Sequence, residues 1–145
     1  MIQRKSKTGK GFTLIEVLIG LALMGVAVMG LAELFTLAVL QNRQADRIAN
    51  ATFLAQQEID TVRNMLLADI TAMANNTIDD IIDLNSDGVN DYRRITQVLL
   101  TGNLYDVRVL VFSAEQIGTA AAALIADPEG HRVRAQIQTL ISRGI

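Results

Sequence analysis

A carboxylate, Glu16, lies near the start of a long apolar segment of this 145-residue chain. The segment runs from Phe12 to Leu40, and the next acidic residue, Glu33, follows only after the uncharged residues 17–32. A carboxylate within hydrocarbon costs about 2.5–3.5 kcal/mol unless a partner neutralises it. We therefore expect Glu16 either to pair with a cation or to lie at the headgroup level of a membrane.

A second set of oxygen-bearing side chains alternates along residues 83–91, where Gly88 permits a sharp turn. The segment resembles the first nine positions of calcium loops of the EF-hand and thrombospondin-repeat kinds, although Arg94 stands where the EF-hand glutamate would be. Calcium binds several hard oxygens. The predicted ligands are the side chains of Asp83, Asn85, Asp87 and Asp91 and the carbonyl of Val89. The alternative is a turn without a metal, because Asp, Asn and Gly favour turns by themselves.

The composition excludes several classes of site. The chain contains no cysteine and one histidine, so it has no thiol nucleophile, no disulfide and no His-rich metal centre. It also lacks the motifs of phosphate loops, zinc hydrolases, serine hydrolases and dinucleotide-binding domains. A formal net charge of -2 gives no general reason to expect nucleic-acid binding. We therefore expect a structural or binding protein and not an enzyme, with no cofactor other than calcium.

The uneven distribution of charge predicts a membrane span. Residues 1–11 contain basic residues and no acidic residue, and the apolar segment 12–40 follows them directly. A helix over residues 17–32 is about 24 Å long, and its apolar neighbours extend it to the roughly 30 Å of a bilayer core. Because basic residues favour the cytoplasmic side, we expect one pass through the inner membrane, with the C-terminal part in the periplasm.

The junction between the basic and apolar parts reads Gly11-Phe12-Thr13-Leu14-Ile15-Glu16-Val17. It closely resembles the cleavage and methylation motif of type IV prepilins and type II secretion pseudopilins. The resemblance implies that prepilin peptidase removes the leader 1–11 by cutting between Gly11 and Phe12, and that the new Phe12 amine is methylated. It also implies that inner-membrane lipid surrounds the helix before assembly, and that Glu16 then pairs with the Phe12 amine of a neighbouring pilin or pseudopilin subunit.

Within this family, the apolar segment and the sequence LAQQEIDTVR resemble PilV-type minor pilins. Main pilus subunits often carry a helix-bending proline near the end of the apolar segment, whereas the only proline here is Pro128. The resemblance thus implies a minor pilin that contributes to the assembly, priming or tip of a type IV pilus. One alternative is a minor pseudopilin of a type II secretion system. Another is a membrane-tethered module that binds calcium or a surface.

The helical pattern continues beyond the apolar segment. No proline or glycine occurs from residue 31 to residue 87, and mainly apolar residues recur every three or four positions. This expected buried stripe consists of Ile48, Thr52, Ala55, Ile59, Val62, Leu66, Ile70 and Met73. We predict an amphipathic helix over 41–74 that continues the membrane helix, so that one helix runs from about residue 12 to residue 73.

The part after this helix, residues 75–145, has the alternating pattern of β-strands. We expect strands at 93–100, 105–113 and 132–142, with Gly102-Asn103 as a hairpin turn and residues 127–130 as a second turn. Residues 120–123 are expected to form a short helical turn or a loop. In the last strand Val133, Ala135, Ile137 and either Thr139 or Ile141 are expected to share one face.

Three strands are marginally stable by themselves, so they need a further surface to pack on. The amphipathic part of the long helix supplies that surface. The expected fold class is therefore α+β, with a small antiparallel sheet packed on the C-terminal half of a long N-terminal helix. This is also the lollipop shape that the pilin resemblance implies.

Overall fold

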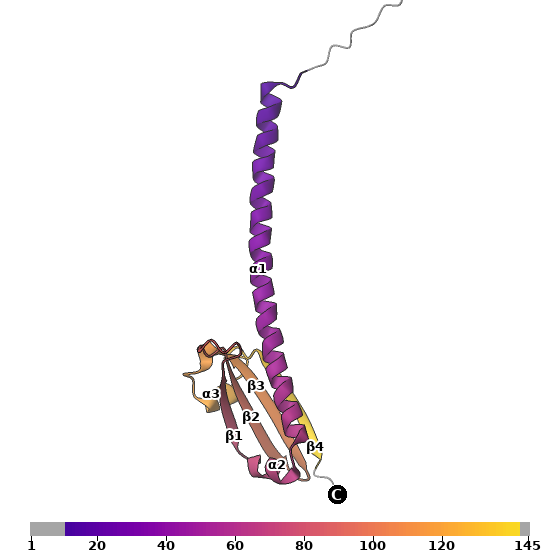
Figure 1. Cartoon of the computed structure of the whole chain (residues 1–145), viewed down its shortest axis with the longest axis vertical. Helices are drawn as coiled ribbons and strands as arrows, with labels where there is room; N and C mark the ends of the chain where they lie inside the picture. Colours follow the sequence, from indigo (N-terminus) through magenta and orange to yellow (C-terminus); the bar gives the residue numbers. More distant parts are fainter. Residues whose placement is uncertain (1–10, 143–145) are drawn as a thin grey trace, which may run out of the picture. The chain divides into compact units, whose positions relative to one another are not determined.

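The computed structural model describes residues 11–142, and the chain divides into two compact units between Arg43 and Gln44. The predicted leader therefore lies, up to Lys10, outside the described residues. Helix α1 begins at Leu14 and ends at Asn64, and its residues 14–43 belong to the first unit (Figure 1). Every residue from 11 to 50 is exposed. The first unit is thus a helix without a core of its own.

The second unit contains the rest of α1 and a sheet with four antiparallel strands in the order β1-β2-β3-β4 (Figure 1). The strands are β1 Thr77–Ile82, β2 Tyr92–Thr101, β3 Leu104–Ser113 and β4 Ala135–Ser142. The other elements are the helices α2 Leu67–Met73 and α3 Ala121–Ala126 and the 3-10 turn η1 Ala114–Gln116. The sheet packs against the helix, which confirms the predicted pilin-like α+β fold.

The hairpin between β2 and β3 sets the register of the sheet centre. Thr101 pairs with Leu104, so the connection is the predicted two-residue turn Gly102-Asn103. Gly102 has a φ of 62°, which suits glycine at the first central position of a type II′ turn. Because side chains alternate along each strand, this register gives both strands the same buried face.

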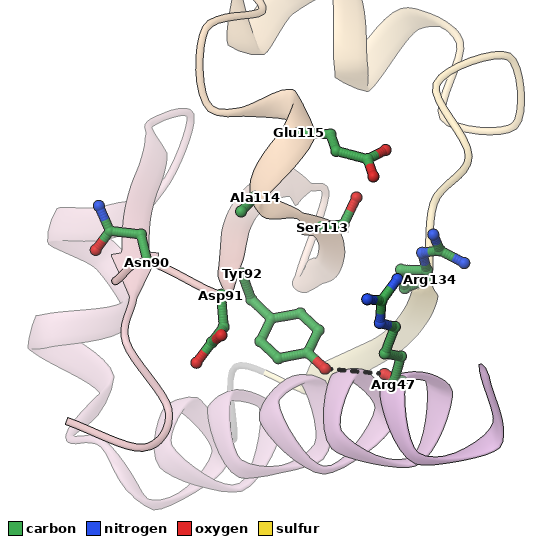
Figure 2. Close-up of a pocket in the computed structure, with 8 residues that line it drawn as sticks. All are labelled: Arg47, Asn90, Asp91, Tyr92, Ser113, Ala114, Glu115 and Arg134. Carbon is green, nitrogen blue, oxygen red and sulfur yellow. Dashed lines mark hydrogen bonds between the residues drawn. The ribbon is translucent and has the colours of Figure 1, made fainter. Parts of the chain in front are cut away.

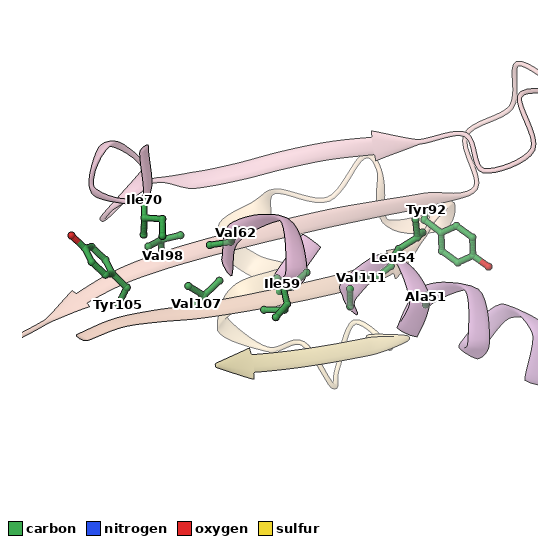
Figure 3. Close-up of a cluster of buried hydrophobic side chains, with 12 residues drawn as sticks. Ala51, Leu54, Ile59, Val62, Ile70, Tyr92, Val98, Tyr105, Val107 and Val111 are labelled. Atoms are coloured by element: carbon green, nitrogen blue, oxygen red, sulfur yellow. The ribbon is translucent and has the colours of Figure 1, made fainter. Parts of the chain in front are cut away.

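One face of the sheet forms the main core with α1 and α2 (Figure 3). The helices contribute Ala51, Leu54, Ala55, Ile59, Val62 and Ile70, and the strands contribute Tyr92, Val98, Tyr105, Val107, Val109 and Val111. Burying a large apolar side chain stabilises a fold by about 1.5–3 kcal/mol. This face of the sheet, and not helix propensity, therefore holds residues 51–62 of α1 in place.

The opposite face carries a smaller core near α3. It consists of Ile95, Leu110, Phe112 and Leu124, with Val133 partly buried against it. Ala135, Ile137 and Ile141 pack instead on the main core, as predicted. The prediction that Val133 shares their face was wrong, because β4 begins only at Ala135 and Arg132 before it has a left-handed φ of 56°.

The prediction of one helix from residue 12 to residue 73 was wrong at its C-terminal end. The helix stops at Asn64, Leu66 is extended with φ -64° and ψ 148°, and α2 begins at Leu67. The break redirects the chain so that Ile70 reaches the core. Leu66 itself is 74% exposed, so it does not belong to the buried stripe.

The predicted stripe was also wrong on α1 at Ile48 and Thr52, which are exposed. The buried positions are Ala51, Leu54, Ala55, Glu58, Ile59 and Val62. Small alanines occupy part of this face, and they allow the helix backbone to approach the sheet closely. The buried face is therefore rotated slightly from the one that the larger apolar residues indicated.

The sheet has a fourth strand, β1, that the sequence analysis did not predict. Its sequence TIDDII contains two adjacent carboxylates, which strands usually avoid. The predicted helical turn near residues 120–123 corresponds to α3. The predicted division into segments 12–40, 41–74 and 75–145 stays a prediction.

Candidate functional site

The predicted processing and assembly residues lie together at the start of α1. Gly11, Phe12, Thr13 and Glu16 border one shallow hollow, and Phe12 is 83% exposed. Thr13 caps the helix, because its side-chain oxygen accepts a hydrogen bond from the Glu16 amide at 3.4 Å and its carbonyl accepts one from Val17 at 3.3 Å. This cap, one residue after the expected new N-terminus Phe12, fixes the start of the helix at Leu14.

Thr13 and Glu16 have the spacing of a capping box, a signal that the sequence analysis missed. Glu16 lies in the first turn of α1, where the unpaired amides of the helix favour a negative charge. Its carboxylate has no ion pair within residues 11–142. The cap therefore holds the Glu16 backbone at a defined position, and its carboxylate is unpaired among the described residues.

Glycine at position 11 is not required by the described fold. A Cβ added to Gly11 would meet no described atom within 4 Å, and its φ is outside the left-handed region. The same openness holds for Gly20, Gly25 and Gly30 on α1. The described residues therefore give no structural reason for a glycine at position 11.

The first half of α1 presents a continuous apolar surface. Its large side chains are exposed, including Leu21, Met24 and Phe35 at 62%, 65% and 74%. The helix is long and apolar enough to cross a membrane, and none of its most apolar window is buried. A surface of this size needs lipid or other subunits to cover it.

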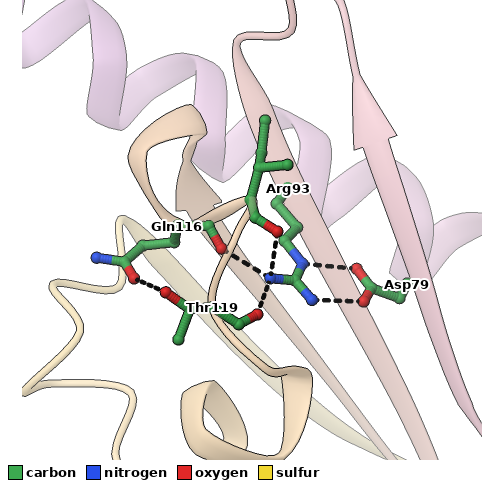
Figure 4. A network of polar contacts seen from close by, with 5 residues as sticks. Asp79, Arg93, Gln116 and Thr119 are labelled. Carbon is green, nitrogen blue, oxygen red and sulfur yellow. Dashed lines mark hydrogen bonds and ion pairs between the residues drawn. The ribbon is translucent and has the colours of Figure 1, made fainter.

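In the second unit, two adjacent arginines tie the edge strand β1 to the rest of the fold. Arg93 is buried, and its Nε and Nη2 donate to Asp79 Oδ1 and Oδ2 at 2.8 and 2.7 Å (Figure 4). Its Nη1 donates to the carbonyls of Gln116, Ile117 and Thr119. The bidentate contact lowers the pKa of Asp79 and raises that of Arg93, against the opposing effect of burial.

Arg94 faces the other side of β2, because successive residues of a strand alternate. Its Nη2 lies 3.0 Å from Glu58 Oε2 on α1 and 2.9 Å from Asp80 Oδ2 on β1. Glu58 lies on the helix face that packs on the sheet, and it is only 7% exposed. The pairing of Asp79-Asp80 with Arg93-Arg94 was the sequence signal that could have revealed β1.

The predicted calcium ligands lie in the loop between β1 and β2. Asp83 accepts hydrogen bonds from the amides of Asp87 and Gly88 at 3.3 and 2.8 Å, and Asp87 accepts one from Val89 at 2.8 Å. Asn85 donates to Asp87 Oδ2 at 2.9 Å. These hydrogen bonds define the turn, with Gly88 at φ 85°.

Asp91, at the end of the loop, accepts a hydrogen bond from the Leu84 amide at 3.0 Å. The loop oxygens have the chemistry that calcium prefers, but they are directed at loop amides in this conformation. Within residues 11–142 no three His, Cys, Asp or Glu side chains are arranged to hold a metal ion. The calcium site stays a prediction, and binding would require these side chains to turn.

Comparison with known proteins identifies the N-terminal feature. Residues 7–32 match the prokaryotic N-terminal methylation motif, which covers Gly11, Phe12 and Glu16. No curated protein and no solved structure matches the chain. The match implies processing by prepilin peptidase, and together with the apolar helix it indicates anchoring in a membrane before assembly. The chain therefore carries the prepilin-type methylation motif at the start of a long apolar helix, in a pilin-like α+β fold.

Proposed function

We propose that this chain is a minor subunit of a type IV pilus that enters the filament through the first half of α1. The observation that carries the proposal is the methylation motif at the start of a helix whose residues 14–50 are all exposed. The exposed apolar side chains of such a helix must be covered by lipid or by neighbouring helices. Filament assembly replaces the lipid with neighbouring helices.

The open position of Gly11 supports cleavage after this residue. A membrane peptidase must bind the chain in an extended form, and a residue without a side chain fits closely beside a catalytic centre. Nothing in the described fold requires glycine there. Cleavage between Gly11 and Phe12 places the new amine directly before the Thr13 cap and four residues before Glu16.

Glu16 then supplies the specificity of assembly. In the lipid its carboxylate costs about 2.5–3.5 kcal/mol unless it is paired. The Phe12 amine of a neighbouring subunit is a cation at the matching depth, so pairing neutralises both groups. This contact favours transfer from lipid to filament and fixes the axial register of the two subunits.

Mass spectrometry of the protein recovered from its own membranes tests the processing step. We expect a chain that begins at Phe12 and carries one additional methyl group. A chain that still begins at Met1 in cells with an active prepilin peptidase would refute the assembly proposal. The apolar segment would then be a plain anchor, and the second unit would have to carry the function.

A substitution of Glu16 tests the assembly step separately. We expect Glu16→Gln to abolish recovery of the protein in the filament fraction while leaving cleavage and the sheet unchanged, because Glu16 is exposed and lies outside the second unit. Glu33→Gln is the matched control, since Glu33 is a second exposed acid on the same helix. Equal loss with both variants would contradict a specific pairing at Glu16.

The type of machine is the finer part of the proposal. The uninterrupted α1 and the single proline at position 128 support a minor pilin rather than a main shaft subunit. We expect deletion of the gene to reduce surface pili and to leave type II secretion intact. Loss of secretion with normal pili would favour the alternative, a minor pseudopilin.

A further inference from the structure

The second unit contains a pocket that the assembly proposal does not use. It has a volume of about 250 Å³ and lies between α1, the start of β2, the end of β3 and the residue before β4 (Figure 2). Its lining residues are Arg47, Asn90, Asp91, Tyr92, Ser113, Ala114, Glu115 and Arg134. The Tyr92 hydroxyl donates to the backbone carbonyl of Arg47 at 3.3 Å, which joins the pocket floor to α1.

Two of these residues are cations without a counter-ion. The guanidinium groups of Arg47 and Arg134 lie on the same side of the pocket in Figure 2. Neither side chain forms an ion pair or a hydrogen bond with another described residue, and Arg134 Nε is shielded from solvent without a partner. Arg93 and Arg94, by contrast, are both paired with carboxylates.

The carboxylates that border the pocket do not neutralise these arginines. Asp91 Oδ2 accepts the Leu84 amide, and Glu115 is exposed and forms no ion pair within the described residues. The Ser113 hydroxyl adds a further donor to the lining. Two guanidinium groups and a hydroxyl around one hollow are the donor set that binds phosphate oxygens.

The position of Arg47 in the chain suggests where such a phosphate is found. Arg47 follows Leu40, the last residue of the apolar segment, by seven residues. This separation corresponds to about 10 Å along a helix and to at most about 25 Å in an extended chain. Both distances bring Arg47 within reach of the headgroups at the membrane surface.

We propose that this pocket binds the phosphate of a phospholipid headgroup while the subunit is still anchored in the membrane. The inference rests on the membrane stage of the proposed function. Arg47 and Arg134 hold the phosphate from one side, and Ser113 donates to a remaining oxygen. Binding at this point restrains the second unit near the membrane surface until the subunit leaves the lipid.

Titration of the full chain with a soluble short-chain phospholipid tests the site. The protein is kept in a phosphate-free maltoside detergent, and the amide NMR signals of Ser113 and Ala114 report on the pocket. We expect saturable shifts with dihexanoyl phosphatidylglycerol and much weaker binding of inorganic phosphate. We expect none with dihexanoylglycerol, which has the same acyl chains without phosphate.

Arg47→Gln and Arg134→Gln are each expected to raise the dissociation constant about tenfold, because each removes charge-assisted hydrogen bonds. Arg43→Gln is the matched control, since Arg43 lies one helical turn before Arg47 but does not line the pocket. Its effect is expected to stay within about twofold. Melting curves of the three variants should match the wild type, because none of these side chains is needed for the core.

Three results would overturn the proposal. If Arg43→Gln weakens binding as much as Arg47→Gln, the attraction is general and the pocket is not the site. If inorganic phosphate binds as tightly as the lipid, the ligand is a soluble oxyanion. If binding survives both pocket variants, the lipid binds elsewhere. Each result is independent of cleavage and methylation at Phe12, so the assembly proposal is tested separately.

Discussion

Within α1, residues 14–43 and residues 44–64 share one backbone conformation but have different surroundings. The first part buries no side chain, whereas the second buries Ala51, Leu54, Ala55, Glu58, Ile59 and Val62. The first part is the more apolar of the two. Burial in this chain therefore depends on the presence of an opposing surface and not on hydrophobicity alone.

The comparison shows how one helix can serve two tasks. Residues 44–64 bury their apolar face within the chain by packing on the sheet. Residues 14–43 leave theirs exposed, and in our proposal lipid covers them before assembly and other subunits cover them after it. Mutations in the two parts should thus separate folding from assembly.

The largest expected difference in stability between the parts concerns two apolar side chains. Ile59 is 2% exposed in the main core, and Leu21 is 62% exposed. We expect Ile59→Ala to lower the free energy of unfolding of the sheet by about 2–5 kcal/mol, because it leaves a cavity. Urea denaturation of the full chain in detergent measures this change.

Leu21→Ala is the control, because it removes as much side-chain volume as Ile59→Ala but from an exposed position. We expect it to leave the urea midpoint unchanged, since Leu21 is exposed and does not belong to the main core. A clear shift of the midpoint with Leu21→Ala would mean that the first part of α1 contributes to the fold. The contrast between the two parts would then be wrong.

The sequence allowed this contrast to be predicted because both signals are local. A long uncharged run indicates a membrane helix, and alternating β-branched residues indicate β2, β3 and β4. The Gly102-Asn103 turn was predicted for the same reason, since glycine accepts the required φ. Gly11, Phe12 and Glu16 were predicted as site residues because their spacing resembles the prepilin motif, and their roles stay predictions.

Features that depend on distant partners were not predictable in this way. β1 contains two acids, and its stability comes from Arg93 and Arg94 on the next strand. Glu58 is buried only because Arg94 neutralises it. The two arginines of the pocket, Arg47 and Arg134, are far apart in sequence and are brought to one hollow by the sheet.

Glu58 and Glu33 extend the comparison to charged residues. Glu58 is 7% exposed and pairs with Arg94 at 3.0 Å, whereas Glu33 is exposed without an ion pair among residues 11–142. We expect Glu58→Ala to cost about 3 kcal/mol, because it leaves a largely buried guanidinium with only Asp80. Glu33→Ala should not change the unfolding curve. Equal curves for both variants would contradict a structural role for the ion pair.

Asp79 gives the second unit a specific response to acid. Its pKa lies below the usual 3.8, chiefly because of the hydrogen bonds from Arg93. A carboxylate with a lowered pKa stabilises the fold above its unfolded pKa, and this stabilisation is lost as the pH falls through the folded value. We expect Asp79→Asn to cost about 2 kcal/mol at pH 7, since Asp79 is only partly shielded from water.

The same variant should lose less stability than the wild type when the pH is lowered from 7 to about 3. Urea midpoints at the two pH values measure the difference. Asp60→Asn is the control, because Asp60 is exposed and forms no ion pair in the described part of the chain. If the wild type and Asp79→Asn lose the same stability between these two pH values, the contact with Arg93 does not set the pKa of Asp79.

The smallest effect is expected from calcium at the loop before β2. Asp83 and Asp87 already accept loop amides, so a cation must compete with these hydrogen bonds. With a dissociation constant of about 1 mM, typical of weak extracellular sites, about 5 mM calcium stabilises the fold by roughly 1 kcal/mol. We expect calcium, and not magnesium, to raise the melting temperature slightly, and Asp87→Asn to remove the increase. If both ions raise the melting temperature equally, or if calcium still raises it in Asp87→Asn, the loop is not a calcium site but a turn held by its own hydrogen bonds. In either case the effect should be confined to the second unit, because its source lies outside residues 14–43.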